Sequence, residues 1–198
     1  MNKRTICLVL TLVCALTMLA QHYNIVKNIA YTMKTDTYSA QRLKLDIYYQ
    51  EQATDLPVVV WFHGGGLTSG EKDFPYKLKE KNCVLVAVNY RLLPNVTIDQ
   101  TIDDAAEAVA WVMNHITEYG GSTKKMIVSG HSAGGYLTMM LALNKQWLDR
   151  YGKDANQIAA YVPFSGQAIS HFSYRKMKGI GELKPTVDEF APLYWVRK

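Results

Sequence analysis

The chain has 198 residues, of which 48% are hydrophobic and 20% are charged, and its formal net charge is +5 at pH 7. This ordinary globular composition, without repeats or low-complexity stretches, fits one domain and excludes a second core of comparable size. The basic residues are typical of solvated surface positions, so we expect no nucleic-acid partner.

Residues 1–20 have the features of a secretory signal peptide. Lys3 and Arg4 precede an uncharged apolar run, 6–19, and the small residue Ala20 follows it. A membrane anchor is the alternative, but the run is short for a span, which needs about 20 residues. We therefore expect a secreted or periplasmic protein, cleaved near Ala20, with no stable membrane span after removal of the leader.

Cysteine usage and metal-ligand spacing give no sign of a cofactor. Removal of the leader takes Cys7 and Cys14 away and leaves Cys83 alone, so the mature chain has no intramolecular disulfide. Cys83 opens an apolar run, where a buried thiol on a strand is the simplest interpretation. No cluster of cysteine and histidine has the spacing of a metal site. We expect neither a metal nor another cofactor.

The first half of the mature chain contains three predicted strands. Residues 42–49 alternate apolar and polar side chains, which indicates a half-buried strand. Residues 57–62 and 84–88 are continuous apolar runs, as buried parallel strands require. Between these two runs, residues 74–81 favour a short helix.

The second half continues the alternation of helices and strands. Apolar residues recur every three or four positions over 98–116, which predicts an amphipathic helix that ends at Gly120 and Gly121. The sequence then predicts a strand over 125–129, a central helix over 133–143 and a strand over 158–164. Residues 166–198 are expected to be irregular, with short helices. This order predicts an α/β fold for residues 21–198, with a doubly wound, largely parallel sheet and helices on both faces.

Two aspartates of the 98–116 helix, Asp103 and Asp104, allow two interpretations. One of them could serve as an acid of a catalytic site. Their place near the start of a helix favours capping or a structural salt link, with Arg91 as the candidate partner.

Residues 130–134 read Gly-His-Ser-Ala-Gly, directly after a predicted strand and before a predicted helix. A serine on such a sharp turn takes a strained, positive-φ backbone, and Gly130 and Gly134 leave room for it. The first helical N–H groups then lie beside the serine oxygen. This pattern makes Ser132 a candidate nucleophile and the N–H of Ala133 a candidate oxyanion donor.

A second glycine motif, His63-Gly64-Gly65-Gly66, follows the 57–62 strand. Both motifs fall at the carboxyl ends of parallel strands, the edge at which ligands bind in such sheets. The N–H groups of Gly64 and Gly65 are therefore candidate partners of Ala133 around an oxyanion. Together the two motifs predict acyl-transfer chemistry, most simply ester hydrolysis.

These motifs resemble those of α/β-hydrolases of the hormone-sensitive-lipase type, especially secreted bacterial carbohydrate esterases related to acetyl-xylan and feruloyl esterases. The segments that carry the resemblance are 59–70, 87–92, 103–111, 119–121 and 129–137. The resemblance implies Ser132 as nucleophile, with Gly64, Gly65 and Ala133 forming the oxyanion hole. Leu67 is a departure, because family members often have an aromatic residue after the glycines.

The family places its catalytic acid and then its histidine after the serine. His171 is the only histidine after Ser132, and we expect it to be a loop residue. The acid and base are expected beyond Lys198, so that the sheet lacks its last two strands and the strand over 158–164 becomes an exposed, association-prone edge.

The sequence thus predicts a secreted serine carboxylesterase that hydrolyses small acyl or aryl esters, or esters of glycans, through an acyl-enzyme on Ser132. An amidase-type hydrolase resembling arylformamidases is one alternative, since that chemistry shares the same turn. A truncated, inactive binding protein is another.

Overall fold

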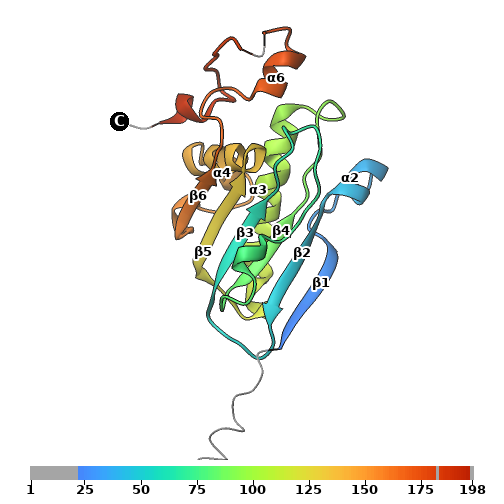
Figure 1. Ribbon diagram of the computed structural model, residues 1–198, viewed down its shortest axis with the longest axis vertical. Helices are drawn as coiled ribbons and strands as arrows, with labels where there is room; N and C mark the ends of the chain where they lie inside the picture. Colours follow the sequence, from blue (N-terminus) through green and yellow to red (C-terminus); the bar gives the residue numbers. More distant parts are fainter. Residues whose placement is uncertain (1–21, 182, 197–198) are drawn as a thin grey trace, which may run out of the picture.

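The computed structural model describes residues 22–181 and 183–196, so the predicted leader, residues 1–20, lies outside the described residues. The described part contains one six-stranded sheet in the order β1-β2-β4-β3-β5-β6 (Figure 1). The strands are β1 (Tyr23–Ala30), β2 (Lys44–Gln50), β3 (Leu56–Phe62), β4 (Val84–Val88), β5 (Gly121–His131) and β6 (Ala160–Phe164). The helices are α2 (Thr37–Arg42), α3 (Ile98–His115), α4 (Ala133–Leu143), α5 (Gln146–Asp149) and α6 (Phe172–Met177), with short 3-10 turns η1 (Tyr76–Leu78), η2 (Ile116–Tyr119), η3 (Ala155–Gln157) and η4 (Pro192–Trp195).

The sheet is parallel from β4 through β3 and β5 to β6, and antiparallel where β2 pairs with β1 and β4. The α/β architecture predicted from the sequence is confirmed, and the five predicted strands are present. β1 was not predicted, because it is a partly exposed edge strand whose polar residues conceal the alternation. β6 is the other edge of the sheet in the described part.

The helix predicted over 74–81 is wrong, because the structure forms only η1 there. Pro75 precedes this turn, and Glu80 and Asn82 have positive φ angles of 58° and 52°. Left-handed residues end a right-handed helix, so the segment closes after one turn.

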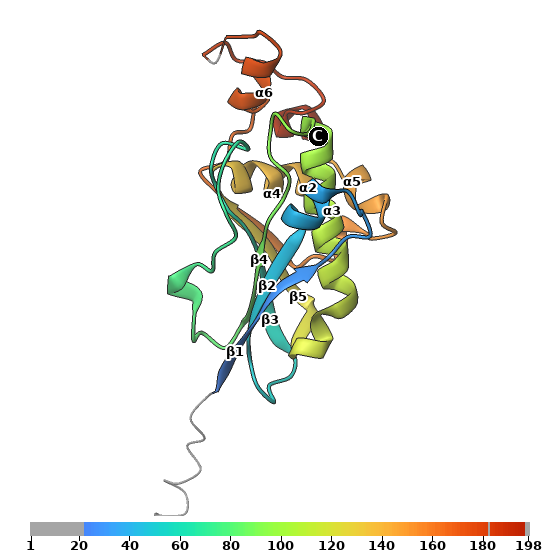
Figure 2. The ribbon, with the colours of Figure 1, turned by 90° about the vertical axis from the view of Figure 1, so that its right-hand side faces the viewer.

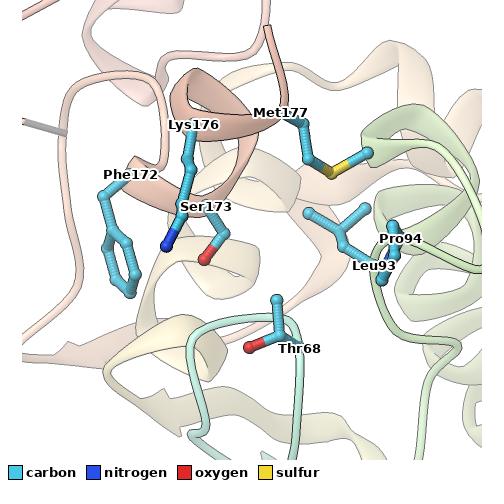
Figure 3. Close-up of a pocket in the computed structure, with 7 residues that line it drawn as sticks. All are labelled: Thr68, Leu93, Pro94, Phe172, Ser173, Lys176 and Met177. Atoms are coloured by element: carbon cyan, nitrogen blue, oxygen red, sulfur yellow. The ribbon is translucent and has the colours of Figure 1, made fainter. Parts of the chain in front are cut away.

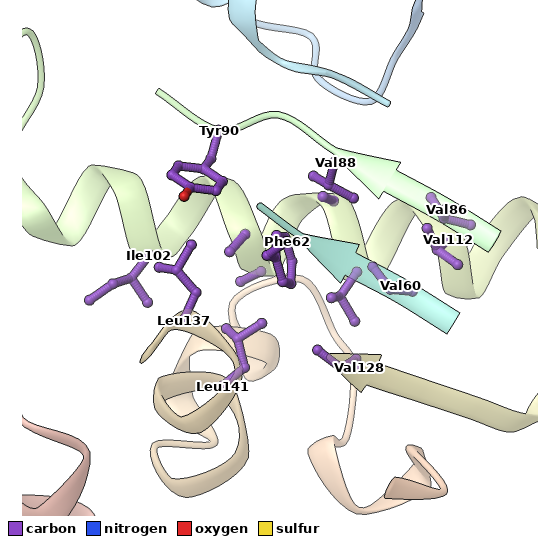
Figure 4. Close-up of a cluster of buried hydrophobic side chains, with 14 of the residues drawn as sticks. Val60, Phe62, Val86, Val88, Tyr90, Ile102, Val112, Val128, Leu137 and Leu141 are labelled. Atoms are coloured by element: carbon purple, nitrogen blue, oxygen red, sulfur yellow. The ribbon is translucent and has the colours of Figure 1, made fainter. Parts of the chain in front are cut away.

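The main core lies between the sheet and the pair α3 and α4. Side chains of both helices interdigitate with alternate residues of β3, β4 and β5 (Figure 4); the labelled members are Val60, Phe62, Val86, Val88, Tyr90, Ile102, Val112, Val128, Leu137 and Leu141. The opposite face of the sheet is covered by the segment that contains η1 (Figure 2). The segment between β3 and β4, which lies on this face, forms loops and the short turn η1 in the described residues.

The predicted salt link of Asp104 is confirmed. Arg91 donates to its carboxylate through Nε at 2.8 Å and Nη2 at 2.6 Å, and the Asp104 side chain is fully buried. The helix start is capped elsewhere, where the Gln100 side chain accepts from the N–H of Thr97 at 3.0 Å. Asp104 is thus a structural residue that ties α3 to the segment after β4.

Cys83 is buried, as predicted, and its Sγ lies 3.6 Å from the carbonyl oxygen of Leu78. Burial raises the pKa of this thiol above its usual value. Across residues 22–181 and 183–196, no helix has both the length and the apolar character that crossing a bilayer requires.

Candidate active site

Ser132 lies on a sharp turn between the end of β5 and the start of α4. Its backbone is strained, with φ 55° and ψ −112°, as the strand-to-helix motif predicts. The N–H of Ser132 donates to the carbonyl oxygen of Phe164 at 2.8 Å, and its own carbonyl accepts from the N–H of Tyr136 at 2.9 Å. These two bonds hold the turn between β6 and the first turn of α4.

Two glycines allow this turn to sit against the end of β3. A Cβ on Gly134 would overlap the carbonyl oxygen of Phe62, and a Cβ on Gly130 would lie 2.7 Å from the same oxygen. Real Cβ atoms do not approach a carbonyl oxygen so closely, so only glycine fits at either position. The start of α4 thus packs directly on the backbone at the carboxyl end of β3.

The glycine loop, residues 63–70, follows β3 and turns back on itself. Gly65, Gly66 and Leu67 all have positive φ angles, of 111°, 64° and 62°. The N–H groups of Thr68 and Ser69 both donate to the carbonyl of Gly65, at 3.1 and 3.0 Å. Leu67 is fully buried, so the residue that departs from the family pattern belongs to the core.

The structure brings the loop and the serine turn together. A Cβ on Gly64 would lie 3.5 Å from the Cβ of Ser132 and 3.3 Å from the carbonyl oxygen of His131. Ala133 begins α4, where the first N–H groups have no partner within the helix. The four site residues predicted from the sequence, Ser132, Gly64, Gly65 and Ala133, therefore occupy one edge of the sheet, at the positive end of the α4 dipole.

A pocket of about 310 Å³ lies beside the glycine loop (Figure 3). It is lined by Thr68, Leu93, Pro94, Phe172, Ser173, Lys176 and Met177. The pocket is joined to the loop directly, because the Ser173 hydroxyl donates to the carbonyl of Gly66 at short range. Sequence reasoning missed this pocket, since α6 has no motif and reaches the loop only through the tertiary fold.

His171 is a buried residue at the start of α6 rather than a partner of the serine. Its ring meets Tyr136 edge-on at 5.2 Å between centroids, and its Nδ1 accepts from the N–H of Ser173 at 3.3 Å. In the part of the chain that the structure describes, no hydrogen bond joins His171 to Ser132. Burial, with a smaller effect of the nearby Arg175, lowers the pKa of His171 to about 4.

This lowered pKa predicts a loss of stability in acid. The unfolded chain binds a proton on His171 at its ordinary pKa of 6.5, whereas the folded chain binds it only near pH 4. The contribution of His171 to the unfolding free energy is therefore complete above pH 6.5. It is lost as the pH falls from 6.5 to about 4, which lowers the unfolding free energy by about 3 kcal/mol. Denaturant unfolding across this range measures it.

His171→Asn is the matched variant, because asparagine keeps a cap acceptor for Ser173 and does not titrate. We expect a flatter dependence of the unfolding free energy on pH between 4 and 6.5. The same substitution at the half-exposed His115 is the control for loss of a histidine. An unchanged slope in His171→Asn would contradict the assignment.

The parallel strands, the serine on its strand-to-helix turn and the adjacent glycine loop are together those of an α/β-hydrolase. More particularly, the chain belongs to the BD-FAE family, whose model matches residues 45–183.

Curated relatives have names of ester hydrolases. A probable isoprenylcysteine alpha-carbonyl methylesterase of Oryza sativa subsp. japonica is 28% identical over 79% of this chain and 41% of its own length. A carboxylesterase of Mycobacterium tuberculosis is 35% identical over 48% of this chain and 32% of its own length. The chain thus spans less than half the length of these relatives.

Solved structures share the fold. Esterase B from Lactobacillus rhamnosis superposes with a TM-score of 0.57 at 19% identity, covering 83% of this chain and 54% of that protein. A truncated form of a carbohydrate esterase from gut microbiota superposes with a TM-score of 0.62 at 16% identity, covering 87% of this chain and 72% of that protein. At these identities the likeness concerns the fold alone.

Proposed function

We propose that this protein is a serine carboxylesterase that hydrolyses small acyl or aryl esters, including esters carried on glycans. The observation that carries the proposal is the approach of the glycine loop to the strained serine turn, with Gly64 beside Ser132. Membership of the BD-FAE family and the names of the curated relatives support the same chemistry.

In the proposed mechanism, the Ser132 hydroxyl attacks the acyl carbonyl carbon and its proton passes to a general base. The carbonyl oxygen becomes an oxyanion, which the N–H groups of Gly64, Gly65 and Ala133 stabilise. Collapse of the intermediate breaks the bond to the leaving oxygen, which takes the proton back from the base and departs as the alcohol. The acyl group stays on Ser132. Water then attacks this ester in the same way and releases the acid. Among the described residues no hydrogen bond joins a histidine ring to Ser132, so the proposal assigns the base to none of them.

The pocket beside the glycine loop is the proposed place for one group of the ester. Most of its walls are apolar. The apolar residues are Leu93, Pro94, Phe172 and Met177, while Thr68 and Ser173 add hydroxyls and Lys176 adds an ammonium group. An acyl or aryl group fits this lining better than a sugar ring does, because burial of apolar surface is the main source of affinity there. The glycan is therefore proposed as the alcohol, outside the pocket.

Rates with an aryl acetate and with an N-formylaniline, measured on the same protein, test this function. Ester hydrolysis well above amide hydrolysis is expected for a carboxylesterase. Faster hydrolysis of the formamide would favour an amidase of the arylformamidase type, and turnover of neither substrate by folded protein would favour an inactive binding protein.

We also propose that the protein is exported. The support is the sequence of residues 1–20, with Lys3 and Arg4 before an apolar run and Ala20 after it. The expected result is a mature N-terminus at or next to Gln21 in protein recovered outside the cytoplasm, measured by mass spectrometry of the intact chain. Recovery of protein that keeps Met1 would point to an uncleaved anchor.

A further inference from the structure

A buried arginine lies beneath the glycine loop. Arg42 ends α2, and its side chain is only 8% exposed. Its guanidinium donates twice to the carbonyl of Tyr90 in the segment after β4, from Nε at 3.2 Å and from Nη2 at 3.1 Å. An arginine is seldom buried without a specific set of acceptors, so its further contacts show what it holds.

Those contacts go to both ends of the glycine loop. Nη2 lies 3.2 Å from the carbonyl oxygen of Gly70 and 3.4 Å from Nε2 of His63, while Nη1 pairs with the Glu71 carboxylate. The Glu71 carboxylate compensates the buried charge of Arg42, and Asn89 donates a hydrogen bond to the same carboxylate. One guanidinium thus joins the first residue of the loop to its last.

The contacts of His63 define where its proton lies. Nδ1 is 2.6 Å from the carbonyl oxygen of Gly64, which only accepts, so Nδ1 is the donor. Nε2 faces Arg42, which only donates, so Nε2 is the unprotonated acceptor. The ring is fixed further by stacking on Tyr90, at 4.4 Å between centroids and 12° between planes. Burial lowers the pKa of His63, which favours this neutral form.

The bond from His63 determines the direction of a candidate oxyanion donor. The carbonyl of Gly64 and the N–H of Gly65 belong to one planar trans peptide, in which they point in opposite directions. Holding this carbonyl against the buried His63 ring therefore turns the Gly65 N–H away from the core. Gly65 itself is exposed.

We propose that Arg42 is a positioning residue: by donating to Nε2 of His63 and to the carbonyl of Gly70, it keeps His63 in the Nδ1–H tautomer and so aims the Gly65 N–H at the oxyanion. This inference rests on the proposed esterase function. In this role Arg42 stabilises the transition state without touching the substrate. Replacing Arg42 should therefore lower kcat while KM changes little.

Arg42→Lys is the main test, because lysine keeps the charge but lacks the planar fork that reaches His63, Gly70 and Tyr90 together. We expect kcat for an aryl acetate to fall about 10- to 100-fold, less than the 10²–10³-fold cost of removing a whole oxyanion donor. KM should stay within about twofold. Arg150→Lys, directly after the end of α5 and more than half exposed, is the matched control and should keep the wild-type kcat.

Nitrogen-15 NMR of the His63 ring gives a readout that is independent of activity. In the wild-type protein we expect a proton on Nδ1 and none on Nε2, and in folded Arg42→Lys a mixture of tautomers. A wild-type ring protonated on Nε2, or a folded Arg42→Lys with unchanged kcat, would overturn the inference. A wild-type protein without esterase activity would overturn the proposed function instead, and the tautomer would still decide the role of Arg42.

Discussion

Replacing Ser132 with alanine is expected to lower the turnover of a small aryl acetate by active protein about 10⁶-fold, the size of effect seen when the nucleophile of a serine hydrolase is removed. The substitution deletes the attacking oxygen but leaves the glycine loop and the first turn of α4 in place. Residual acceleration of about 10³–10⁴-fold over water would come from the oxyanion donors and substrate binding alone.

Steady-state kinetics and covalent labelling measure this effect together. An aryl phosphonate should attach to wild-type protein at Ser132, located by peptide mass spectrometry, and should not attach to Ser132→Ala. Ser122→Ala, at the opposite end of β5, is the control for loss of a serine hydroxyl. A burst of acylation in Ser132→Ala would show that another residue is the nucleophile.

The second large effect is expected from Gly134→Ala. A methyl group at this position would overlap the carbonyl oxygen of Phe62 and approach that of His63 to 2.9 Å, so α4 must move away from β3. Overpacking against backbone cannot be relieved by a change of rotamer, and we expect a loss of at least about 3 kcal/mol in unfolding free energy. Glycine to alanine within a helix otherwise stabilises by up to about 1 kcal/mol, so the sign itself is diagnostic.

Urea unfolding of both variants and wild type provides the measurement. Gly181→Ala is the matched control, because its added Cβ would have no described atom within 4 Å apart from its chain neighbours, and its backbone is not left-handed. It should unfold within about 0.5 kcal/mol of wild type. A Gly134→Ala protein as stable as wild type would mean that α4 does not start against the end of β3.

The sequence by itself determined the elements that depend on local chemistry. The apolar runs of β3 and β4 and the 3.6-residue period of α3 are visible in the chain. The turn at Ser132 was equally predictable, because its strained backbone demands glycines at fixed offsets and so leaves a pattern in the sequence.

Only the tertiary structure decided which of these elements meet. The sequence does not reveal that α3 and α4 share one face of the sheet, or that α6 brings Phe172 and Ser173 to the glycine loop. Arg42 lies 21 residues from His63 in sequence, and no periodicity connects them. Contacts of this kind depend on how distant segments of the chain pack together and not on local conformational preferences. A single sequence therefore has no pattern that predicts them. The residues of the candidate site were therefore predictable, whereas the pocket beside it and the arginine beneath it were decided by packing.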